Sequence, residues 1–389
     1  MSRDTVARRR VGGSCSRDRR AVPGSVAHHL DSQGRRETGH SLRRETNRQV
    51  GHEPKRDVYD IGIVGCGVIG DRLAATIDDH AATTVTAACD VDESRVTDFT
   101  DEYDCVGYTD HERLVEADLD AVYVGVPPAH HVAVATDALA AGHHVLCEKP
   151  IAPTAAGGER LTAAAAETDR VTAVNLPFRY TPGFRELCDR VANGGVGTVR
   201  RVELRFRFPE WPREWQDVEW LEGREQGGPI REVGTHFLFG VRELFGPVER
   251  VTARVQYDGP ERHERSVVGG FTVDGVDGTL DLATGVAASE ENSLTVLGTE
   301  GRLTLREWHR LVADDGEGSE RVVNEDRTST TRLLLDEFVT AIDSHAEGSG
   351  GETSDADLVS FEEATAVQRV VDGVFDSEGE AVDPRVAGD

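Results

Sequence analysis

Residues 58–70 read VYDIGIVGCGVIG, a short apolar run followed by three spaced glycines. Apolar residues then recur at helical spacing over residues 69–80, so the stretch predicts a strand, a tight turn and a helix. In such a turn the first glycine allows the bend, the second lets the backbone approach a pyrophosphate, and the third permits close packing of helix on strand. Free N–H groups and the helix dipole would hold the diphosphate. The residues expected to contact a dinucleotide are Gly65, Gly67, Val68, Ile69 and Gly70.

Asp90 closes the next predicted strand, residues 84–89, at the spacing where an acidic residue binds the adenosine ribose hydroxyls. A carboxylate at this place would repel a 2′-phosphate. The sequence therefore favours NAD over NADP as the cofactor, although NADP stays possible. The alternative reading of Asp90 is a solvated turn aspartate, because aspartate is common in this chain.

Predicted strands and helices alternate, with short turns between them, from residue 57 to residue 176. After the first two strands, further strands are expected at residues 121–126, 143–147 and 171–175, with helical patterns between them. This alternation is typical of an α/β fold with a doubly wound parallel sheet, the Rossmann fold. We assign residues 57–176 to a dinucleotide-binding domain.

The pattern changes in the rest of the chain. A helix is expected at residues 182–192, and helical patterns return at residues 332–345 and 358–375. Between them lie strand-like segments at residues 198–208, 248–257, 266–273, 278–284, 292–297 and 302–306. No long helix interrupts the later five, which predicts a second, α+β domain over residues 177–389 with a large, mostly antiparallel open sheet. Its C-terminal helices can pack back on the first domain.

Two further motifs lie at the carboxyl ends of predicted parallel strands, where doubly wound sheets bind ligands. Residues 126–131 read VPPAHH and include Pro127 and His131, and residues 142–150 read GHHVLCEKP. Lys149 is one of only two lysines in the chain, since arginine fills nearly every other cationic position. This scarcity argues for a role in the cleft rather than for an ordinary surface lysine, and a cis peptide bond to Pro150 could aim the side chain there.

The glycine turn, Asp90, His131 and the triplet Glu148-Lys149-Pro150, followed by a sheet domain, resemble the glucose–fructose oxidoreductase / inositol dehydrogenase (Gfo/Idh/MocA) family. The resemblance runs from about residue 58 to about residue 384, and the triplet with the Ala-Gly-x-His-Val run before it is its specific part. It implies an NAD(P)-dependent oxidoreductase, with Pro127, His131 and Glu148 on the cofactor side and Lys149 as a catalytic cation.

The family also carries a glycine-rich segment followed by an Asp-x-Gly-x-His motif, and residues 227–236 here read GGPIREVGTH. His236 matches the family's histidine, which resembles a general acid/base beside the nicotinamide. Glu232 stands where the family usually has aspartate, and on a helix it would share a face with His236. An imidazole near its ordinary pKa can take a hydroxyl proton while Lys149 stabilises the charge on the oxygen. A capping or packed histidine is the alternative, although the glycines before it would suit a close approach to a ligand.

Three residues are candidates for the substrate side. Residues 175–180, NLPFRY, resemble a family segment that follows the sixth strand, so Asn175 and Arg179 are expected to line the cleft, with bracing of the domain junction as the alternative. Trp215 lies in a tryptophan-rich loop just before the glycine-rich segment. Its indole could stack on sugar C–H surfaces, or serve in subunit contact or core packing.

Charge limits the partners of this protein. The chain has 43 basic and 71 acidic side chains, a net charge of -28, and residues 1–56 hold a local basic excess. We expect residues 1–56 to be a disordered basic extension. It is either an arm for nucleic acid or an acidic partner, or a dispensable extension or upstream sequence translated from a misplaced start. The acidic remainder disfavours nucleic acid, and its scarcity of lysine is typical of a cytoplasmic protein of a salt-loving organism. No membrane-length apolar run and no metal-ligand or disulfide spacing of the six cysteines occurs.

Together with the motifs, the resemblance therefore implies a dehydrogenase that transfers hydride between a sugar, polyol or sugar derivative and a nicotinamide. Lys149, His236 and Glu232 are its expected catalytic residues, and a homo-oligomer is its expected assembly. Two alternatives stay open within the resemblance. One is an NAD-dependent glycosidase, and the other is a dinucleotide-binding regulator without catalysis, for which the change at Glu232 leaves room.

Overall fold

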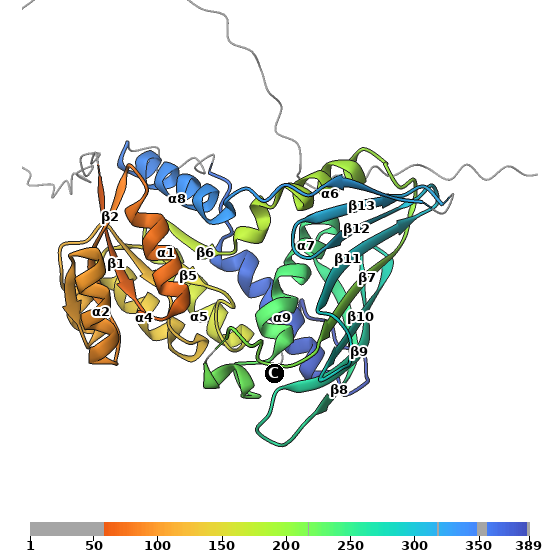
Figure 1. The fold of residues 1–389 in the computed structure, drawn as a ribbon, viewed down its shortest axis with the longest axis horizontal. Coiled ribbons are helices and arrows are strands. Elements are labelled where there is room, and N and C mark those ends of the chain that lie inside the picture. Colours follow the sequence, from red (N-terminus) through yellow and green to blue (C-terminus); the bar gives the residue numbers. More distant parts are fainter. Residues whose placement is uncertain (1–57, 217, 317–318, 348–355, 387–389) are drawn as a thin grey trace, which may run out of the picture.

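Two sheets, each with its own helices, make up the protein (Figure 1). The structure is a computed structural model that describes residues 58–216, 218–316, 319–347 and 356–386. The predicted basic extension, residues 1–56, lies outside these described residues. No helix in the described residues is long and apolar enough to cross a membrane.

The first sheet is six-stranded and parallel, with the strand order β3-β2-β1-β4-β5-β6. This order reverses between β1 and β4, the place where ligands bind in doubly wound sheets. The α/β fold and the Rossmann arrangement that the sequence predicts are therefore confirmed. The strands are β1 (Tyr59–Val64), β2 (Thr83–Cys89), β3 (Val106–Tyr108), β4 (Ala121–Val124), β5 (His144–Glu148) and β6 (Thr172–Asn175).

Helices cover both faces of this sheet. Five of them follow its strands: α1 (Val68–Asp78), α2 (Glu93–Tyr103), α3 (His111–Val115), α4 (Pro128–Ala141) and α5 (Ala155–Ala166). A sixth, α8 (Thr330–Ala346), comes from the far end of the chain and inserts Leu334, Leu335 and Phe338 into the core on the α1 side. The parallel sheet is thus buried on both faces, as parallel sheets require.

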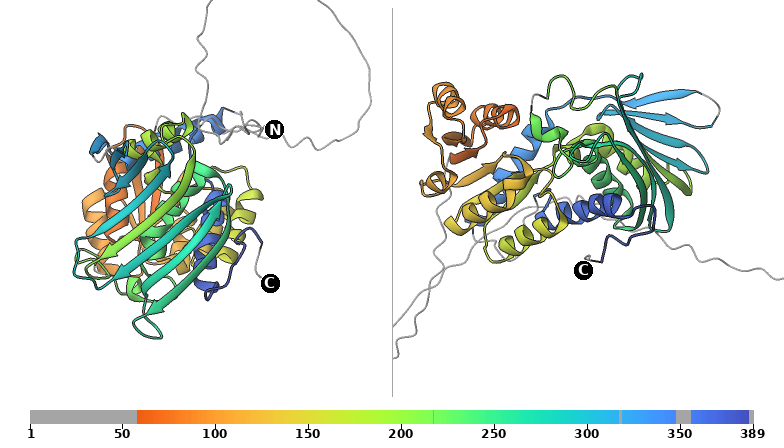
Figure 2. Two further views of the ribbon diagram at one scale, coloured as in Figure 1. Left: turned by 90° about the vertical axis from the view of Figure 1, so that its right-hand side faces the viewer. Right: turned by 90° about the horizontal axis from the view of Figure 1, so that it is seen from below.

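The second sheet has eight strands in the order β14-β13-β12-β11-β7-β10-β9-β8. Only β7 and β10 pair in parallel, so the mostly antiparallel sheet that the sequence predicts is confirmed. Figure 2 shows its outer face without a covering helix. The strands are β7 (Val199–Phe208), β8 (Val248–Tyr257), β9 (Glu264–Val273), β10 (Val276–Thr284), β11 (Glu291–Gly298), β12 (Arg302–Arg306), β13 (Arg310–Asp314) and β14 (Glu320–Asn324).

The helices between the two sheets join the domains. The inner face of the large sheet packs on α6 (Pro182–Ala192), α7 (Thr235–Phe245) and α9 (Phe361–Asp376). Helix α9 also packs along α5 of the first domain, and Val174 in β6 donates a backbone hydrogen bond to Val359 just before α9. One continuous apolar cluster therefore runs from the parallel sheet to the large sheet, which holds the facing edges of the two domains in place.

Candidate active site

The glycine turn after β1 has the geometry that its sequence predicts. Gly65 has φ of +109°, a conformation that side chains other than glycine rarely adopt. A Cβ on Gly70 would collide with the Gly65 carbonyl oxygen, so this glycine lets α1 pack against the turn. A Cβ on Gly67 would meet nothing within 4 Å, so the middle of the turn faces open space.

The start of α1 leaves its backbone donors free for a ligand. Gly67 is the N-cap residue and supplies no side-chain hydrogen bond, so the first N–H groups of the helix have no capping partner from that residue. Val68 and Ile69 in the first turn are 53% and 41% exposed. An open, uncapped helix start beside an unfilled glycine turn fits the diphosphate of a dinucleotide.

Asp90 lies at the carboxyl end of β2, next to the glycine turn. One of its carboxylate oxygens accepts a hydrogen bond from the Cys66 N–H at 3.0 Å, and the other accepts one from the Asp92 N–H at 3.0 Å. The side chain is only partly buried. The carboxylate thus ties the turn to β2 and still presents lone pairs at the place where a ribose would lie.

The Glu148-Lys149-Pro150 triplet ends β5 on the same edge, and the Lys149–Pro150 peptide bond is cis. Glu148 is buried, and burial raises the pKa of its carboxyl group. Its oxygens accept hydrogen bonds from the Tyr123 hydroxyl at 2.8 Å, from the Asn175 side-chain amide, and from the Lys149 N–H at 3.1 Å. Glu148 and Asn175 therefore hold the ends of β4, β5 and β6 together next to Lys149 in the chain.

Lys149 pairs with Glu232 across the domain junction. Its Nζ lies 2.6 Å from Glu232 Oε2 and donates at 3.3 Å to the Glu232 carbonyl oxygen. The two side chains are 14% and 17% exposed. The additional methylene of glutamate, relative to aspartate, does not prevent this contact, so one ammonium from the first domain and one carboxylate from the second meet in the cleft.

Glu232 and His236 are carried by consecutive short elements. Glu232 lies in a one-turn π-helix, η3 (Ile230–Gly234), and His236 is the second residue of α7. Burial, the Lys149 ammonium and the Arg213 guanidinium all lower the pKa of His236 well below its ordinary value. The expectation of an imidazole near its ordinary pKa is therefore wrong, because burial and two nearby cations disfavour the protonated ring. Its Nδ1 has no hydrogen-bond partner within the described residues.

His131 is buried inside the first domain, so its ring is not exposed at the sheet edge where the cofactor is expected to bind. The ring is fully buried, with Nδ1 at 3.0 Å from the Pro150 carbonyl oxygen and Nε2 at 2.8 Å from the Val126 carbonyl oxygen. Burial lowers its pKa to about 4. The imidazole thus links the turn after β4, which contains Pro127 and starts α4, to the turn after Lys149.

The segment between β7 and η3 crosses from the large sheet to the first domain. Trp215 is half exposed, and the Arg72 guanidinium of α1 lies 5.2 Å from its ring centroid. Gln216 Nε2 donates to Glu232 at 3.3 Å, and Gln226 accepts from the Ala129 N–H at the start of α4 at 3.0 Å. The segment therefore touches the cofactor-side helices and the Lys149–Glu232 pair.

Arg213, in the same segment, was not among the residues that the sequence suggested. Its side chain is 10% exposed, its Nε donates to Glu290 at 3.1 Å, and its guanidinium lies 5.3 Å from the Trp211 ring centroid. Nη2 is buried and has no partner within the described residues. In the sequence this arginine resembles many others, and only the fold brings it near His236.

Arg179 and the glycines before Glu232 have neighbours that the sequence did not indicate. Arg179 Nε donates to Asp357 at 2.7 Å, and its Nη1 lies near Glu363 and Glu243, at 3.5 and 3.7 Å. This ion-pair cluster favours bracing of the domain junction over contact with a substrate. A Cβ on Gly228 would collide with the buried Glu264 carboxylate. That glycine is needed for internal packing, which corrects the expectation that it allows a ligand to approach.

Comparison with known proteins agrees with this geometry. Residues 59–176 match the model of the oxidoreductase family with an NAD-binding Rossmann fold, and residues 184–304 match the GFO/IDH/MocA C-terminal domain. The chain belongs to the Gfo/Idh/MocA family of oxidoreductases. The resemblance stated from the sequence is thereby confirmed, as is its assignment to NAD-binding Rossmann proteins. No group of side chains in the described residues could hold a metal ion.

Among the similar proteins, two relatives are named for a sugar that they reduce or oxidise, and one solved structure is named for inositol. A dTDP-3,4-didehydro-2,6-dideoxy-alpha-D-glucose 3-reductase of Streptomyces violaceoruber is 31% identical over 66% of this chain and 75% of its own. The D-xylose 1-dehydrogenase (NADP(+)) 2 of Haloferax volcanii is 28% identical over 82% of this chain and 95% of its own. An inositol dehydrogenase homolog complexed with NAD+ from Azotobacter vinelandii has the same fold, with a TM-score of 0.74, 20% identity, and coverage of 85% of this chain and 99% of that one.

Proposed function

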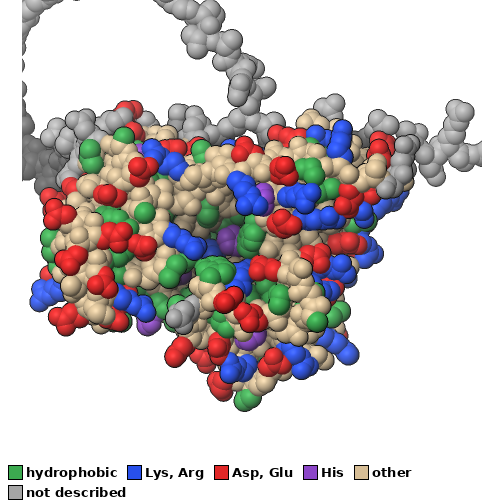
Figure 3. All heavy atoms as spheres, viewed as in Figure 1, with side chains coloured by type: hydrophobic (Ala, Val, Ile, Leu, Met, Phe, Trp, Pro, Cys, Tyr) green, Lys and Arg blue, Asp and Glu red, His purple; other side chains and the backbone are tan. Residues whose placement is uncertain are grey.

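We propose that this Gfo/Idh/MocA protein is an NAD-dependent dehydrogenase that oxidises a secondary hydroxyl of a sugar, polyol or sugar derivative. One observation carries the proposal: Lys149, paired with Glu232 and close enough to His236 to lower its pKa, lies at the sheet edge that also carries the open glycine turn. Figure 3 shows a hollow between the two halves of the molecule, with cationic and histidine side chains in view inside it.

The cofactor residues follow from the shape of that edge. The turn from Gly65 to Gly70 and the first N–H groups of α1 would hold the diphosphate, and Asp90 would accept from the adenosine ribose hydroxyls. When bound, NAD supplies the acceptor for the hydride. The Asp90 carboxylate would repel a 2′-phosphate, which is why NAD is proposed over NADP.

Lys149 acts on the substrate oxygen. Its ammonium is fixed by Glu232 and is largely removed from water, where a charge stabilises a developing alkoxide far more than it would in bulk solvent. Glu148 acts through its hydrogen bond to the Lys149 N–H, which fixes the backbone that bears the lysine. Glu232 is a positioning residue whose carboxylate holds the ammonium in place.

His236 takes the hydroxyl proton. Its lowered pKa keeps the imidazole neutral at neutral pH, so one ring nitrogen has a free lone pair to act as a base. The buried Nδ1 of His236, Nη2 of Arg213 and Oδ1 of Asn175 all lack partners within the described residues. Such atoms cost free energy when left unpaired, and Lys149 and Arg213 both lie near enough to His236 to lower its pKa, which supports binding of a polar ligand at His236.

The experiment is a panel of sugars, polyols and sugar derivatives assayed with NAD and with NADP in molar KCl, following the absorbance of the reduced nicotinamide. The proposal expects at least one compound to reduce free NAD, and to do so faster than it reduces NADP. Conversion of a glycoside without net reduction of NAD would support the glycosidase alternative. Binding of NAD without turnover of any compound would favour the regulator.

A further inference from the structure

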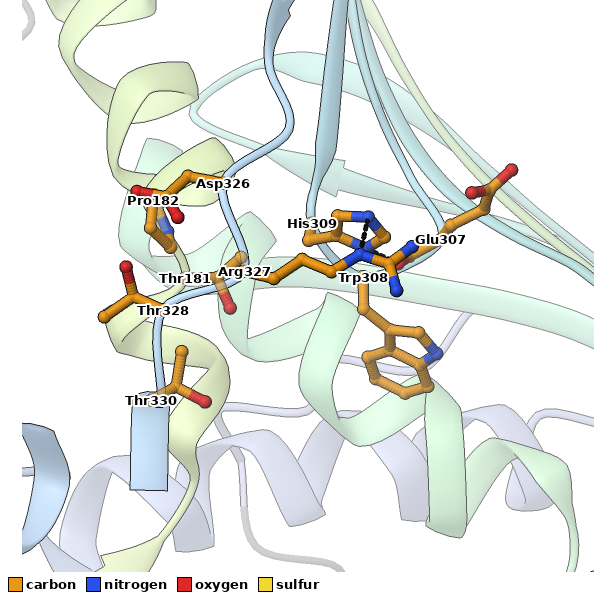
Figure 4. Close-up of a pocket in the computed structure, with 9 residues that line it drawn as sticks. All are labelled: Thr181, Pro182, Glu307, Trp308, His309, Asp326, Arg327, Thr328 and Thr330. Carbon is orange, nitrogen blue, oxygen red and sulfur yellow. Dashed lines mark hydrogen bonds between the residues drawn. The ribbon is translucent and has the colours of Figure 1, made fainter. Parts of the chain in front are cut away.

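A cavity of about 440 Å³ is lined by Trp308 (Figure 4), whose ring contacts the His236 ring. It lies between the start of α6, the turn that joins β12 to β13, and the segment that leads into α8. Its lining includes Thr181, Trp308, His309, Asp326 and Arg327. Its volume falls in the range of about 300–1,000 Å³ that small-molecule sites occupy. None of the catalytic or cofactor residues described above lines it.

Trp308 joins this cavity to the catalytic site. Its ring lies edge-on to the His236 ring, with 5.1 Å between the centroids, and it also packs on Phe237 at 5.3 Å. Glu307 and Trp308 both have positive φ, at 53° and 70°. This backbone conformation is unfavourable for a bulky residue and persists only where the surroundings hold it. The turn therefore fixes one indole that lines the cavity and also contacts the imidazole.

Arg327 and His309 form a fixed polar pair in the same cavity. Arg327 Nε donates to His309 Nε2 at 2.9 Å, so this histidine nitrogen is unprotonated. His309 Nδ1 then carries the proton and donates it to the Glu307 carbonyl oxygen. Within the described residues Arg327 has no ion pair with a carboxylate, which leaves its terminal nitrogens available as donors.

The lining is chemically suited to a neutral sugar unit. An indole ring offers an apolar face, Arg327 offers N–H donors, Thr181 offers a hydroxyl, and the Asp326 and Glu307 carboxylates can accept from sugar hydroxyls. One arginine with a neutral histidine does not outweigh two carboxylates in charge. The strongly acidic body of the protein adds to the repulsion of any anion.

We propose that this cavity is a second sugar subsite, which holds a neutral glycosyl unit attached to the unit oxidised beside Lys149 and His236. The substrate class is accordingly a disaccharide or another glycoside rather than a free monosaccharide. This inference rests on the proposed dehydrogenase function, since it places the reacting unit at His236.

The test compares kcat/KM for neutral disaccharides with that for their constituent monosaccharides, at saturating NAD in molar KCl. We expect a preference of about tenfold or more for a disaccharide, corresponding to about 1.4 kcal/mol of additional binding. Arg327→Ala should remove most of that preference and leave kcat/KM for the monosaccharide within about twofold. Arg321→Ala, an exposed arginine of β14 outside the cavity lining, is the matched control and should change neither value.

Equal rates for mono- and disaccharides would overturn the subsite, as would an Arg327→Ala variant that retains the full preference or slows both substrates alike. If no sugar is oxidised, the proposed dehydrogenase function fails. The subsite is then tested separately, by calorimetry of the binding of the same disaccharides to the NAD-loaded protein. Heat of binding that Arg327→Ala abolishes and Arg321→Ala retains would support it. Absence of that heat would overturn it.

Discussion

Asp90 places a carboxylate beside the glycine turn, where the adenosine ribose is proposed to bind. Asp90→Asn removes the charge, retains an oxygen that can accept from the Cys66 N–H, and should ease the exclusion of NADP. We expect the ratio of kcat/KM for NAD to that for NADP to fall by about tenfold, because one charge pair at close range in a partly buried site contributes about 1–2 kcal/mol. Steady-state kinetics with both cofactors measures the ratio.

Asp92 provides the matched control for that substitution. It lies two residues further along and caps α2 by accepting from the Ser94 N–H at 2.9 Å. Asp92→Asn removes the same charge from the same loop and should leave the cofactor ratio unchanged. An equal change in both variants would mean that the overall charge of the loop, rather than contact with the ribose, sets the preference.

Glu264 predicts a pH dependence of stability. Its side chain is 1% exposed, accepts from the Ile230 N–H at 2.7 Å, and has a pKa raised by burial to about 7. Between pH 4.5 and pH 7 the folded protein thus holds a proton that the unfolded chain releases. This carboxyl group therefore lowers the free energy of unfolding as pH rises through that window, by up to about 3 kcal/mol.

Glu264→Gln removes this titration and keeps the oxygen that accepts from Ile230. The free energy of unfolding of the variant, relative to that of the wild type, should increase as pH rises from 5 to 7.5. Above that range the difference between the two should stay constant. Denaturant unfolding at a series of pH values measures the difference, with the exposed Glu261→Gln as the control. A difference that does not depend on pH would show that Glu264 is not titrating in this window.

Some site residues could be predicted from the sequence and others could not. Lys149 was identified by its rarity and its place after a buried strand, and Glu232 and His236 by their match to the family's Asp-x-Gly-x-His motif. Arg213 and Trp308 lie in irregular segments far apart in the chain, and no local pattern distinguishes them from other arginines and tryptophans. Their positions depend on how the large sheet and its turns fold over α7.

Among the secondary structure elements, most strands of the parallel sheet were predicted, whereas β3, β13, β14 and the buried helix α7 were missed. Strands β1, β2 and β4–β6 are apolar runs, because both faces of a parallel sheet are covered. Strand β3 is only three residues long, and β14 is mostly exposed, so neither has the apolar alternation that indicates a strand. The sequence Glu-Trp-His between β12 and β13 also lacks the glycine or asparagine that normally marks such a turn.

The cluster around Arg179 predicts a loss of stability without a loss of substrate binding. The guanidinium is 17% exposed and joins the segment after β6 to α7 and to the start of α9 through Glu243, Asp357 and Glu363. Arg179→Met should lower the free energy of unfolding by about 2–3 kcal/mol, because it leaves partly buried carboxylates without their cation. Thermal unfolding measures that loss. A rise in KM at unchanged stability would instead assign Arg179 to the substrate.

At the scale of the whole molecule, charge repulsion should make stability depend on salt. The net charge is -28, and salt shortens the range of repulsion to about 3 Å at 1 M. We therefore expect the Tm to fall by several degrees on dilution from molar to tenth-molar KCl. An uncharged osmolyte at equal osmolality should not restore it. A Tm that holds constant on dilution would refute the proposed adaptation to high salt.

The most direct test of the proposed hydride transfer measures Lys149→Ala in two ways, with the best substrate of the panel. The dissociation constant for NAD, measured by calorimetry, should stay within about threefold, because the glycine turn and Asp90 are unchanged. Turnover should fall by about 10²–10³, the loss typical of removing one charge or donor from a reacting oxygen. Unchanged turnover in a variant that still binds NAD would contradict the assignment of this cleft as the active site.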